Sequence, residues 1–74
     1  MGMKVVVKVK FNASIEKFEK FGNGMYLCYL PYPEDDDTQN ILTSLISRNM
    51  GVPLNRVEFA GKDIRKNFVF EARW

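Results

Sequence analysis

The chain has 74 residues, of which 46% are hydrophobic, and its 11 Lys and Arg exceed its 9 Asp and Glu to give a net charge of +2. This length predicts a single domain over residues 1–74 with one small core. The sequence contains no His and one Cys, which excludes His-activated nucleophiles, histidine zinc sites, thiolate metal clusters and an internal disulfide. We therefore favour binding over catalysis, and we predict no catalytic residue, no cofactor and no metal site.

Residues 3–11, MKVVVKVKF, alternate in the way that a half-buried β-strand does. The alternation points one set of side chains to one face, namely Val5, Val7, Val9 and Phe11, and the other set to the opposite face, namely Lys4, Val6, Lys8 and Lys10. Residues 12–14, NAS, favour a turn that ends this strand. Residues 15–21 fit a short helix as well as an irregular strand, because apolar side chains recur there at every third position.

Residues 22–24, GNG, predict a hairpin turn, because all three readily adopt positive φ. The apolar run MYLCYL at residues 25–30 predicts a well-buried strand, in which Cys28 is a small buried thiol. A single unpaired cysteine favours a reducing, cytoplasmic location. No apolar run reaches the ~20 residues that cross a bilayer, so we expect neither a membrane span nor membrane partners, and the lysine-rich start does not resemble a signal peptide.

Residues 37–50 predict the main α-helix. Their apolar side chains recur at helical spacing and form one stripe, which consists of Ile41, Leu42, Leu45, Ile46 and Met50. Gly51 fits a C-terminal cap, Arg48 complements the negative end of the helix, and Pro53 prevents its continuation.

The C-terminal part predicts two more strands, at residues 55–60 and 67–74, with a turn at residues 61–63. In the last strand one face is expected to consist of Phe68, Phe70, Ala72 and Trp74, and the other of Val69, Glu71 and Arg73. The order of elements predicts a two-layer α+β fold, with a mostly antiparallel or mixed β-sheet and one main helix packed on one face.

Four consecutive carboxylates, Glu34, Asp35, Asp36 and Asp37, precede the predicted helix. Aspartate is favoured there, because the first turn of a helix has unpaired N–H groups and a positive dipole end. A divalent cation site is the alternative, but consecutive residues point in different directions, so few of them converge on one ion. We therefore favour helix capping and solvated charge. Since these residues are four of the nine acidic ones, we also expect a polarised molecule.

Several short motifs occur in an order that resembles the YggU-like family of small proteins of unknown function. They are VKVKFNA at the first strand, then Pro33, Asp36 and Asn40 around the helix start, Gly51-Val52-Pro53, and Gly61 with Arg65. The resemblance covers nearly the whole chain and depends on the collinearity of the motifs. It implies an α+β sheet with helices on one side, and it nominates Asn40, Gly61 and Arg65 as positions of interest. The family supplies no established activity.

The chain departs from the family pattern at Asp37, Thr38 and Gln39, where the family has Gly, Lys and Ala, and at Ile64 and Asn67, where it has Ser and Lys. If those positions are functional in the family, their function is altered here. Each nominated position also has a purely structural explanation. Asn40 can bond to loop backbone, Gly61 can permit a turn, and Arg65 can be solvated, and we favour the structural explanation for Gly61.

The leading hypothesis for function is a non-catalytic nucleic-acid-binding domain with a basic face. Its candidate binding residues are Lys8, Lys10, Asp36, Asn40, Arg65 and Lys66. Glu58 and Glu71 could share that face and convert it into ordinary cross-strand ion pairs. A protein-interaction module that uses the acidic loop or an edge strand is the alternative partner class, and a small carboxylate and magnesium enzyme is the third hypothesis.

Overall fold

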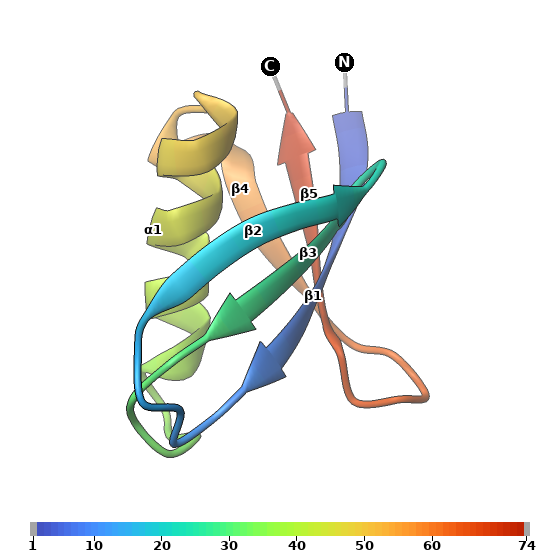
Figure 1. Cartoon of the computed structure of the whole chain (residues 1–74). Helices are drawn as coiled ribbons and strands as arrows, with labels where there is room; N and C mark the ends of the chain where they lie inside the picture. The colour runs from blue at the N-terminus through green and yellow to red at the C-terminus, as the bar shows by residue number, and fades with distance from the viewer. Residues whose placement is uncertain (1, 74) are drawn as a thin grey trace.

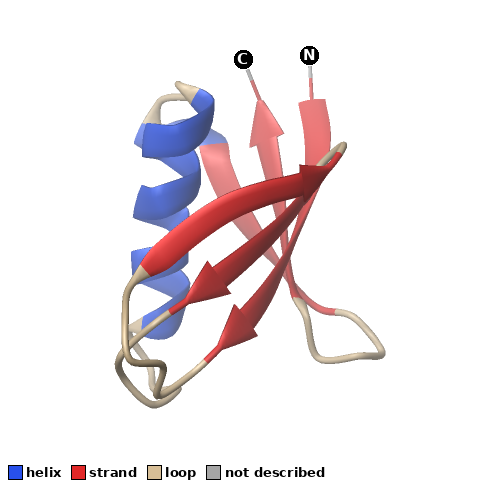
Figure 2. Cartoon of the chain, in the orientation of Figure 1, coloured by secondary structure: helices blue, strands red, loops and turns tan. Residues whose placement is uncertain are grey.

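A computed structural model describes residues 2–73. Its elements in chain order are β1 (Gly2–Lys10), β2 (Lys17–Gly22), β3 (Met25–Tyr29), α1 (Thr38–Met50), the 3₁₀ helix η1 (Leu54–Arg56), β4 (Val57–Lys62) and β5 (Phe68–Arg73). The strands form one sheet in the order β2-β3-β1-β5-β4, and α1 packs against one face of it (Figures 1 and 2). The predicted two-layer α+β fold with one main helix is therefore confirmed.

Strand β1 joins the two halves of the sheet. It pairs in parallel with β3, from Val6 opposite Met25 to Lys10 opposite Tyr29. On its other side it pairs antiparallel with β5, from Gly2 opposite Arg73 to Val7 opposite Phe68. The outer strands β2 and β4 each form an antiparallel hairpin with their neighbour, so the sheet is mixed.

The core lies between α1 and the facing side of the sheet. Val5 and Val7 of β1 are fully buried, as their alternation predicts, and so is Phe70 of β5. The Phe70 ring lies 5.2 Å from that of Phe59 in β4, centroid to centroid. The other buried apolar residues are Tyr26, Cys28, Leu30, Leu42, Leu45, Ile46, Val52, Val57, Phe68 and Ala72.

Helix α1 matches the prediction closely at both ends. It begins after Asp37 and ends at Gly51, which adopts the left-handed conformation (φ 70°) and donates its N–H to the Ser47 carbonyl at 3.0 Å. The buried stripe of the helix, Leu42, Leu45 and Ile46, belongs to the predicted one. Glycine suits this cap because it has no Cβ to oppose positive φ.

One open alternative is resolved by the structure, and two details differ from the sequence prediction. Residues 15–21, which the sequence left open, lie mostly in strand β2. Residues 55 and 56 lie in η1 instead of a strand. The turn expected at residues 61–63 is wrong, because Gly61 (φ 107°) forms a bulge that lets β4 continue to Lys62, and the chain turns at residues 63–66. The predicted position of Trp74 lies outside the described residues.

We predict that Gly24→Ala destabilises the fold more than Gly51→Ala does. Both glycines have a φ near 70°, but a Cβ at Gly24 would lie 2.5 Å from the Lys4 carbonyl oxygen, whereas one at Gly51 would meet nothing within 4 Å. The shared positive φ costs about 1 kcal/mol in each variant. The contact with β1 backbone adds to that cost only at Gly24. Urea denaturation of both variants measures the difference, and equal free energies of unfolding would contradict the prediction.

Candidate functional site

The face of the sheet opposite α1 has no described element packed on it, and we call it the open face. Directly paired residues of neighbouring strands share a face. Lys10 of β1 pairs with Tyr29 of β3, and Tyr29 pairs with Lys17 of β2, so these three form one row on the open face. In the adjacent row, Lys8 pairs with Leu27, which pairs with Glu19. The open face therefore has an aromatic side chain with a lysine on each side.

The charges of these two rows are only partly paired. Lys8 and Lys10 are both exposed, and neither forms an ion pair within residues 2–73. Lys17 Nζ lies 3.4 Å from Glu19 Oε2, with both side chains about half exposed. Ion pairs of this kind contribute little, because water and salt screen them. A negatively charged ligand can therefore meet Lys8 and Lys10 without first breaking an internal ion pair.

The middle of the open face is apolar. Val6 of β1 pairs with Met25 on one side and with Val69 on the other, so the three form a continuous cross-strand row. Val6 and Val69 are partly exposed, and Met25 is 43% exposed. Together with Leu27 and Tyr29, this row forms a partly exposed apolar patch, a kind of surface that often marks a binding site.

The end of the open face formed by the start of β1 and the end of β5 has mixed charge. Glu71 pairs with Lys4 on one side and with Glu58 on the other. Arg73 Nε donates a hydrogen bond to Glu71 Oε1 at 2.7 Å, and this bond, with the nearby carboxylates, raises the pKa of Arg73. Glu58 and Glu71 thus share the open face as expected, but the ion pair of Glu71 is with Arg73 of its own strand and does not cross between strands. The unpaired Lys8 and Lys10 lie at the other end of the face.

The turn at residues 63–66, between β4 and β5, contains two further predicted site residues, Arg65 and Lys66. The carboxylate of Asp63 accepts hydrogen bonds from the backbone N–H groups of Arg65 and Asn67, both at 2.9 Å, and from Asn67 Nδ2 at 3.2 Å. These bonds lower the pKa of Asp63, the bond from the Asn67 backbone having the largest effect. Asp63 therefore holds the turn in one conformation.

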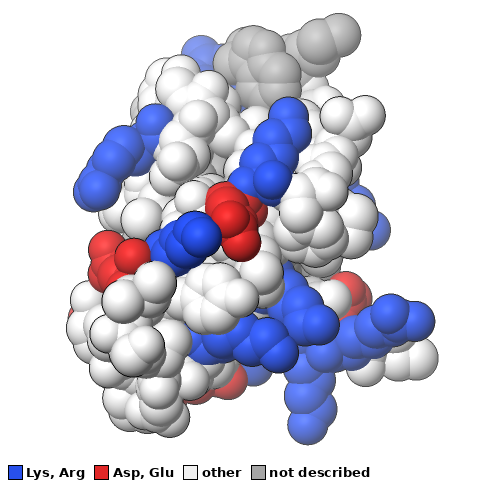
Figure 3. All heavy atoms as spheres, viewed as in Figure 1, with Lys and Arg blue, Asp and Glu red and all other residues white. Residues whose placement is uncertain are grey.

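The register of the sheet places this turn at the same end of the sheet as Lys8 and Lys10. The last β1–β5 pair is Val7 with Phe68, so Lys8 and Lys10 extend beyond it toward the same end at which the turn precedes Phe68. In Figure 1 the turn projects from that end, away from α1. Lys and Arg side chains gather over this lower part of the molecule in Figure 3. Four of the predicted site residues are thus at one end: Lys8, Lys10, Arg65 and Lys66.

The other two predicted site residues, Asp36 and Asn40, are exposed in the loop before α1 and in its first turn. Glu34 of the same loop forms an ion pair with Lys62. Lys62 pairs with the buried Phe68, which faces α1, so the acidic loop contacts the sheet on its helix-covered side. Asp36 and Asn40 therefore belong to the helix-covered side, whereas Lys8 and Lys10 lie on the open face.

The acidic run precedes the helix as predicted, but its hydrogen bonds are not those of the expected aspartate cap. Asp37 occupies the N-cap position, but its side chain makes no capping hydrogen bond. Instead, Asp35 Oδ1 accepts from the Asp37 N–H at 2.8 Å, and Thr38 Oγ1 accepts from the Asp35 N–H at 3.0 Å. Within residues 2–73, no three Cys, Asp or Glu side chains are grouped so that they could hold a metal ion.

Tyr29 and Leu27 were not among the predicted site residues. The signal was present in MYLCYL, since alternation buries Tyr26 and Cys28 and so turns Leu27 and Tyr29 to the opposite face. The row that includes Tyr29 could not be found from sequence, because it depends on the β2–β3–β1 pairing. Because all six residues of MYLCYL are apolar, the sequence shows an alternation of sides but does not show which side is exposed.

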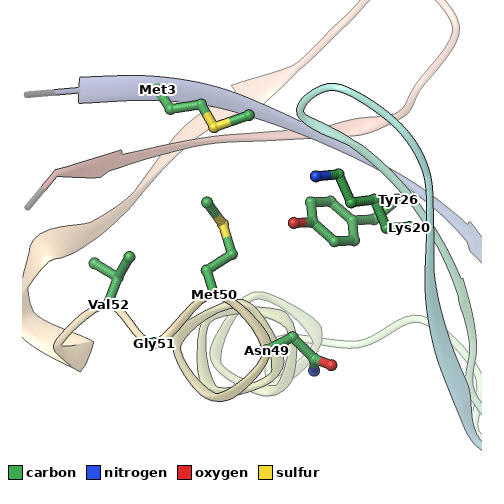
Figure 4. A pocket seen from close by; sticks show the side chains of 7 residues that line it. All are labelled: Met3, Lys20, Tyr26, Asn49, Met50, Gly51 and Val52. Atoms are coloured by element: carbon green, nitrogen blue, oxygen red, sulfur yellow. The ribbon is translucent and has the colours of Figure 1, made fainter.

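A separate hollow of about 420 Å³ lies between the C-terminal end of α1 and the sheet (Figure 4). Its lining consists of Met3, Lys20, Tyr26, Asn49, Met50, Gly51 and Val52. Figure 4 shows the two methionine side chains facing each other across it. None of these described lining residues has a carboxylate, so the hollow offers one cation and no acid and base pair.

Comparison with protein-family models, with curated proteins and with solved structures finds no match to this chain. The resemblance to the YggU-like family therefore stays a prediction. No helix formed by residues 2–73 is long and apolar enough to cross a bilayer. The geometry of the open face and of the 63–66 turn is the basis for inferring function.

We predict that the Asp63 carboxyl titrates below its ordinary value of 3.8, because its hydrogen bonds to the Asn67 and Arg65 backbone favour the charged form. A lowered folded-state pKa stabilises the turn above the unfolded-state pKa, and this stabilisation is lost as pH falls through the folded-state pKa. Carboxyl NMR shifts followed from pH 7 to pH 2 measure the titration. The amide signals of Arg65 and Asn67 should move with the same midpoint, and independent midpoints would contradict the assignment.

Proposed function

We propose that this chain is a non-catalytic nucleic-acid-binding protein that holds single-stranded RNA or DNA on its open face. The observation that supports this most is the row Lys10–Tyr29–Lys17, with the unpaired Lys8 in the next row. Proteins that bind single strands combine cations along the backbone with aromatic side chains on which bases stack. The row supplies both groups on adjacent strands.

The spacing of the row suits this role. Lys10 and Lys17 lie on the strands that flank β3, and neighbouring strands are about 4.8 Å apart, so the two lysines are separated by roughly 10 Å across Tyr29. A base stacked on the Tyr29 ring would therefore have an ammonium group on each side. The apolar row of Val6, Met25 and Val69 continues the surface onto which neighbouring bases could pack.

Single strands suit this surface better than duplexes, because only unpaired bases expose their faces for stacking. The acidic loop does not oppose binding, since its Glu34 bonds to Lys62 on the helix-covered side of the sheet. We place the protein in the cytoplasm, a location supported by Cys28, a free and buried thiol whose pKa burial raises to about 11. A thiolate is therefore scarce at neutral pH, in keeping with a structural role.

The first prediction from this proposal concerns charge. We expect the double variant Lys8→Gln/Lys10→Gln to bind a single-stranded oligonucleotide more weakly than the unmodified chain, because two phosphate contacts are lost. The plot of log affinity against log salt concentration should become shallower by roughly 0.7 for each lost contact. Fluorescence anisotropy with labelled RNA and DNA across a salt series measures both quantities.

The matched control is Lys20→Gln/Arg48→Gln. It removes the same charge from the helix-facing side of β2 and from the last turn of α1. Its affinity should stay close to that of the unmodified chain. Equal losses of affinity in the two double variants would mean that binding is a non-specific electrostatic attraction and does not use the open face. If the unmodified chain shows no binding at low salt, the proposal is wrong. A protein partner at the acidic loop or an edge strand would then be the next candidate.

The second prediction concerns stacking. We expect Tyr29→Ala to weaken single-strand binding roughly 5- to 150-fold, because the stacking of one base contributes about 1–3 kcal/mol. Tyr29→Phe retains the ring and should bind nearly as well as the unmodified chain. The salt dependence should be the same in all three proteins, since no charge changes. A loss as large in Tyr29→Phe as in Tyr29→Ala would indicate that the hydroxyl, and not the ring, is used.

A further inference from the structure

We infer that the 63–66 turn is a second contact element for the same single strand. In this arrangement Arg65 and Lys66 contact phosphates, while Ile64 packs against a base or a sugar. The inference depends on the proposed function and extends it, because it assigns a role to a segment outside the open face. The evidence is the exposure of Ile64, the two flanking cations and the hydrogen bonds that fix the turn.

Ile64 is 99% exposed, more than any other large apolar side chain among residues 2–73. An isoleucine with no internal contact adds nothing to the core, and water solvates it poorly. Arg65 and Lys66 follow it directly, and neither forms an ion pair within the described residues. An apolar tip beside two free cations complements a ligand with both negative charge and exposed flat surfaces, which unpaired nucleotides provide.

The turn is fixed before any ligand arrives. Its backbone closes through the Asp63 N–H to the Asn67 carbonyl at 3.0 Å and the Lys66 N–H to the Asp63 carbonyl at 2.9 Å. Lys66 adopts a positive φ of 65°, a left-handed conformation that residues other than glycine and asparagine rarely adopt. The Asp63 carboxylate bonds described above hold this conformation. A preformed contact element loses less conformational entropy on binding than a mobile one does.

The neighbouring Lys62 is not one of the free cations of the turn, because it has internal partners. Its Nζ lies 4.7 Å from the centre of the Phe68 ring and also bonds to Glu34. Lys62 therefore anchors the base of the hairpin on the helix-facing side. The other hairpin, between β2 and β3, turns at Asn23 and Gly24, which have no cationic and no apolar side chain. Of the two β-hairpin turns within residues 2–73, the β4–β5 turn is thus the one that combines an apolar tip with free cations.

The variant Asp63→Ala tests this inference, because the loss of the fixed turn and the loss of a negative charge change the affinity for a single strand in opposite directions. Removal of a negative charge from a nucleic-acid-binding protein tightens general electrostatic attraction. If the fixed turn contributes to binding, Asp63→Ala instead weakens single-strand affinity, roughly three- to tenfold, because the turn must be ordered on binding. Asp36→Ala removes the same charge from the acidic loop on the helix side and should bind as well as the unmodified chain or slightly better. Anisotropy with a labelled oligonucleotide measures all three.

Two variants at the tip separate the apolar contact from the ionic ones. We expect Ile64→Ser to weaken binding about three- to tenfold without a change in salt dependence, as for a lost apolar contact. Lys66→Asn removes a charge while keeping a residue that tolerates positive φ, and it should make the salt dependence shallower by roughly 0.7. Since Ile64 has almost no internal contact, Ile64→Ser should fold normally even if Asp63→Ala does not.

The outcomes distinguish this inference from the proposed function. If Lys8→Gln/Lys10→Gln loses affinity while Asp63→Ala and Ile64→Ser bind as well as the unmodified chain, the open face is the complete site and the second contact is wrong. If the unmodified chain binds no oligonucleotide, both proposals are wrong. If Asp63→Ala and Ile64→Ser weaken binding while Asp36→Ala does not, the turn is a contact element.

Discussion

The structure depends most on the alternation of side chains along β1, the strand that joins both halves of the sheet. Val5 and Val7 are fully buried beneath α1, and the alternation therefore directs Lys8 and Lys10 to the open face. A slip of one residue would bury the lysines and expose the valines, at a cost a small domain could not sustain. Because β3 and β5 pair directly with β1, the same constraint decides which of their side chains reach each face.

The separation of charge follows from this two-sided arrangement. The acidic loop follows β3 and leads into α1, so it belongs to the helix layer, where the Glu34–Lys62 ion pair attaches it to the sheet. The free cations Lys8 and Lys10 lie on the opposite side. A chain with a net charge of only +2 can therefore present a locally basic surface, because its densest run of acid faces another direction.

Much of the fold followed from local pattern. The alternation of β1 and β5, the helical stripe of α1 and its Gly51 cap were all readable, because each depends on neighbours in sequence. The parallel pairing of β1 with β3 was not, since it depends on distant segments. The turn at residues 63–66 was misplaced because Gly61 signals a turn as strongly as it signals a bulge. Asp63 closes the actual turn through hydrogen bonds to Arg65 and Asn67, which only the folded geometry reveals.

The candidate site was predictable in part for the same reason. Lysines on one face of β1 follow from alternation, but the position of Tyr29 between Lys10 and Lys17 requires the order β2-β3-β1. With one main helix, the chain covers one face of a five-stranded sheet and leaves apolar side chains such as Val6 partly in water on the other. Among residues 2–73 this face therefore combines partly exposed apolar side chains with the exposed Lys8 and Lys10, and the proposed binding function rests on that combination.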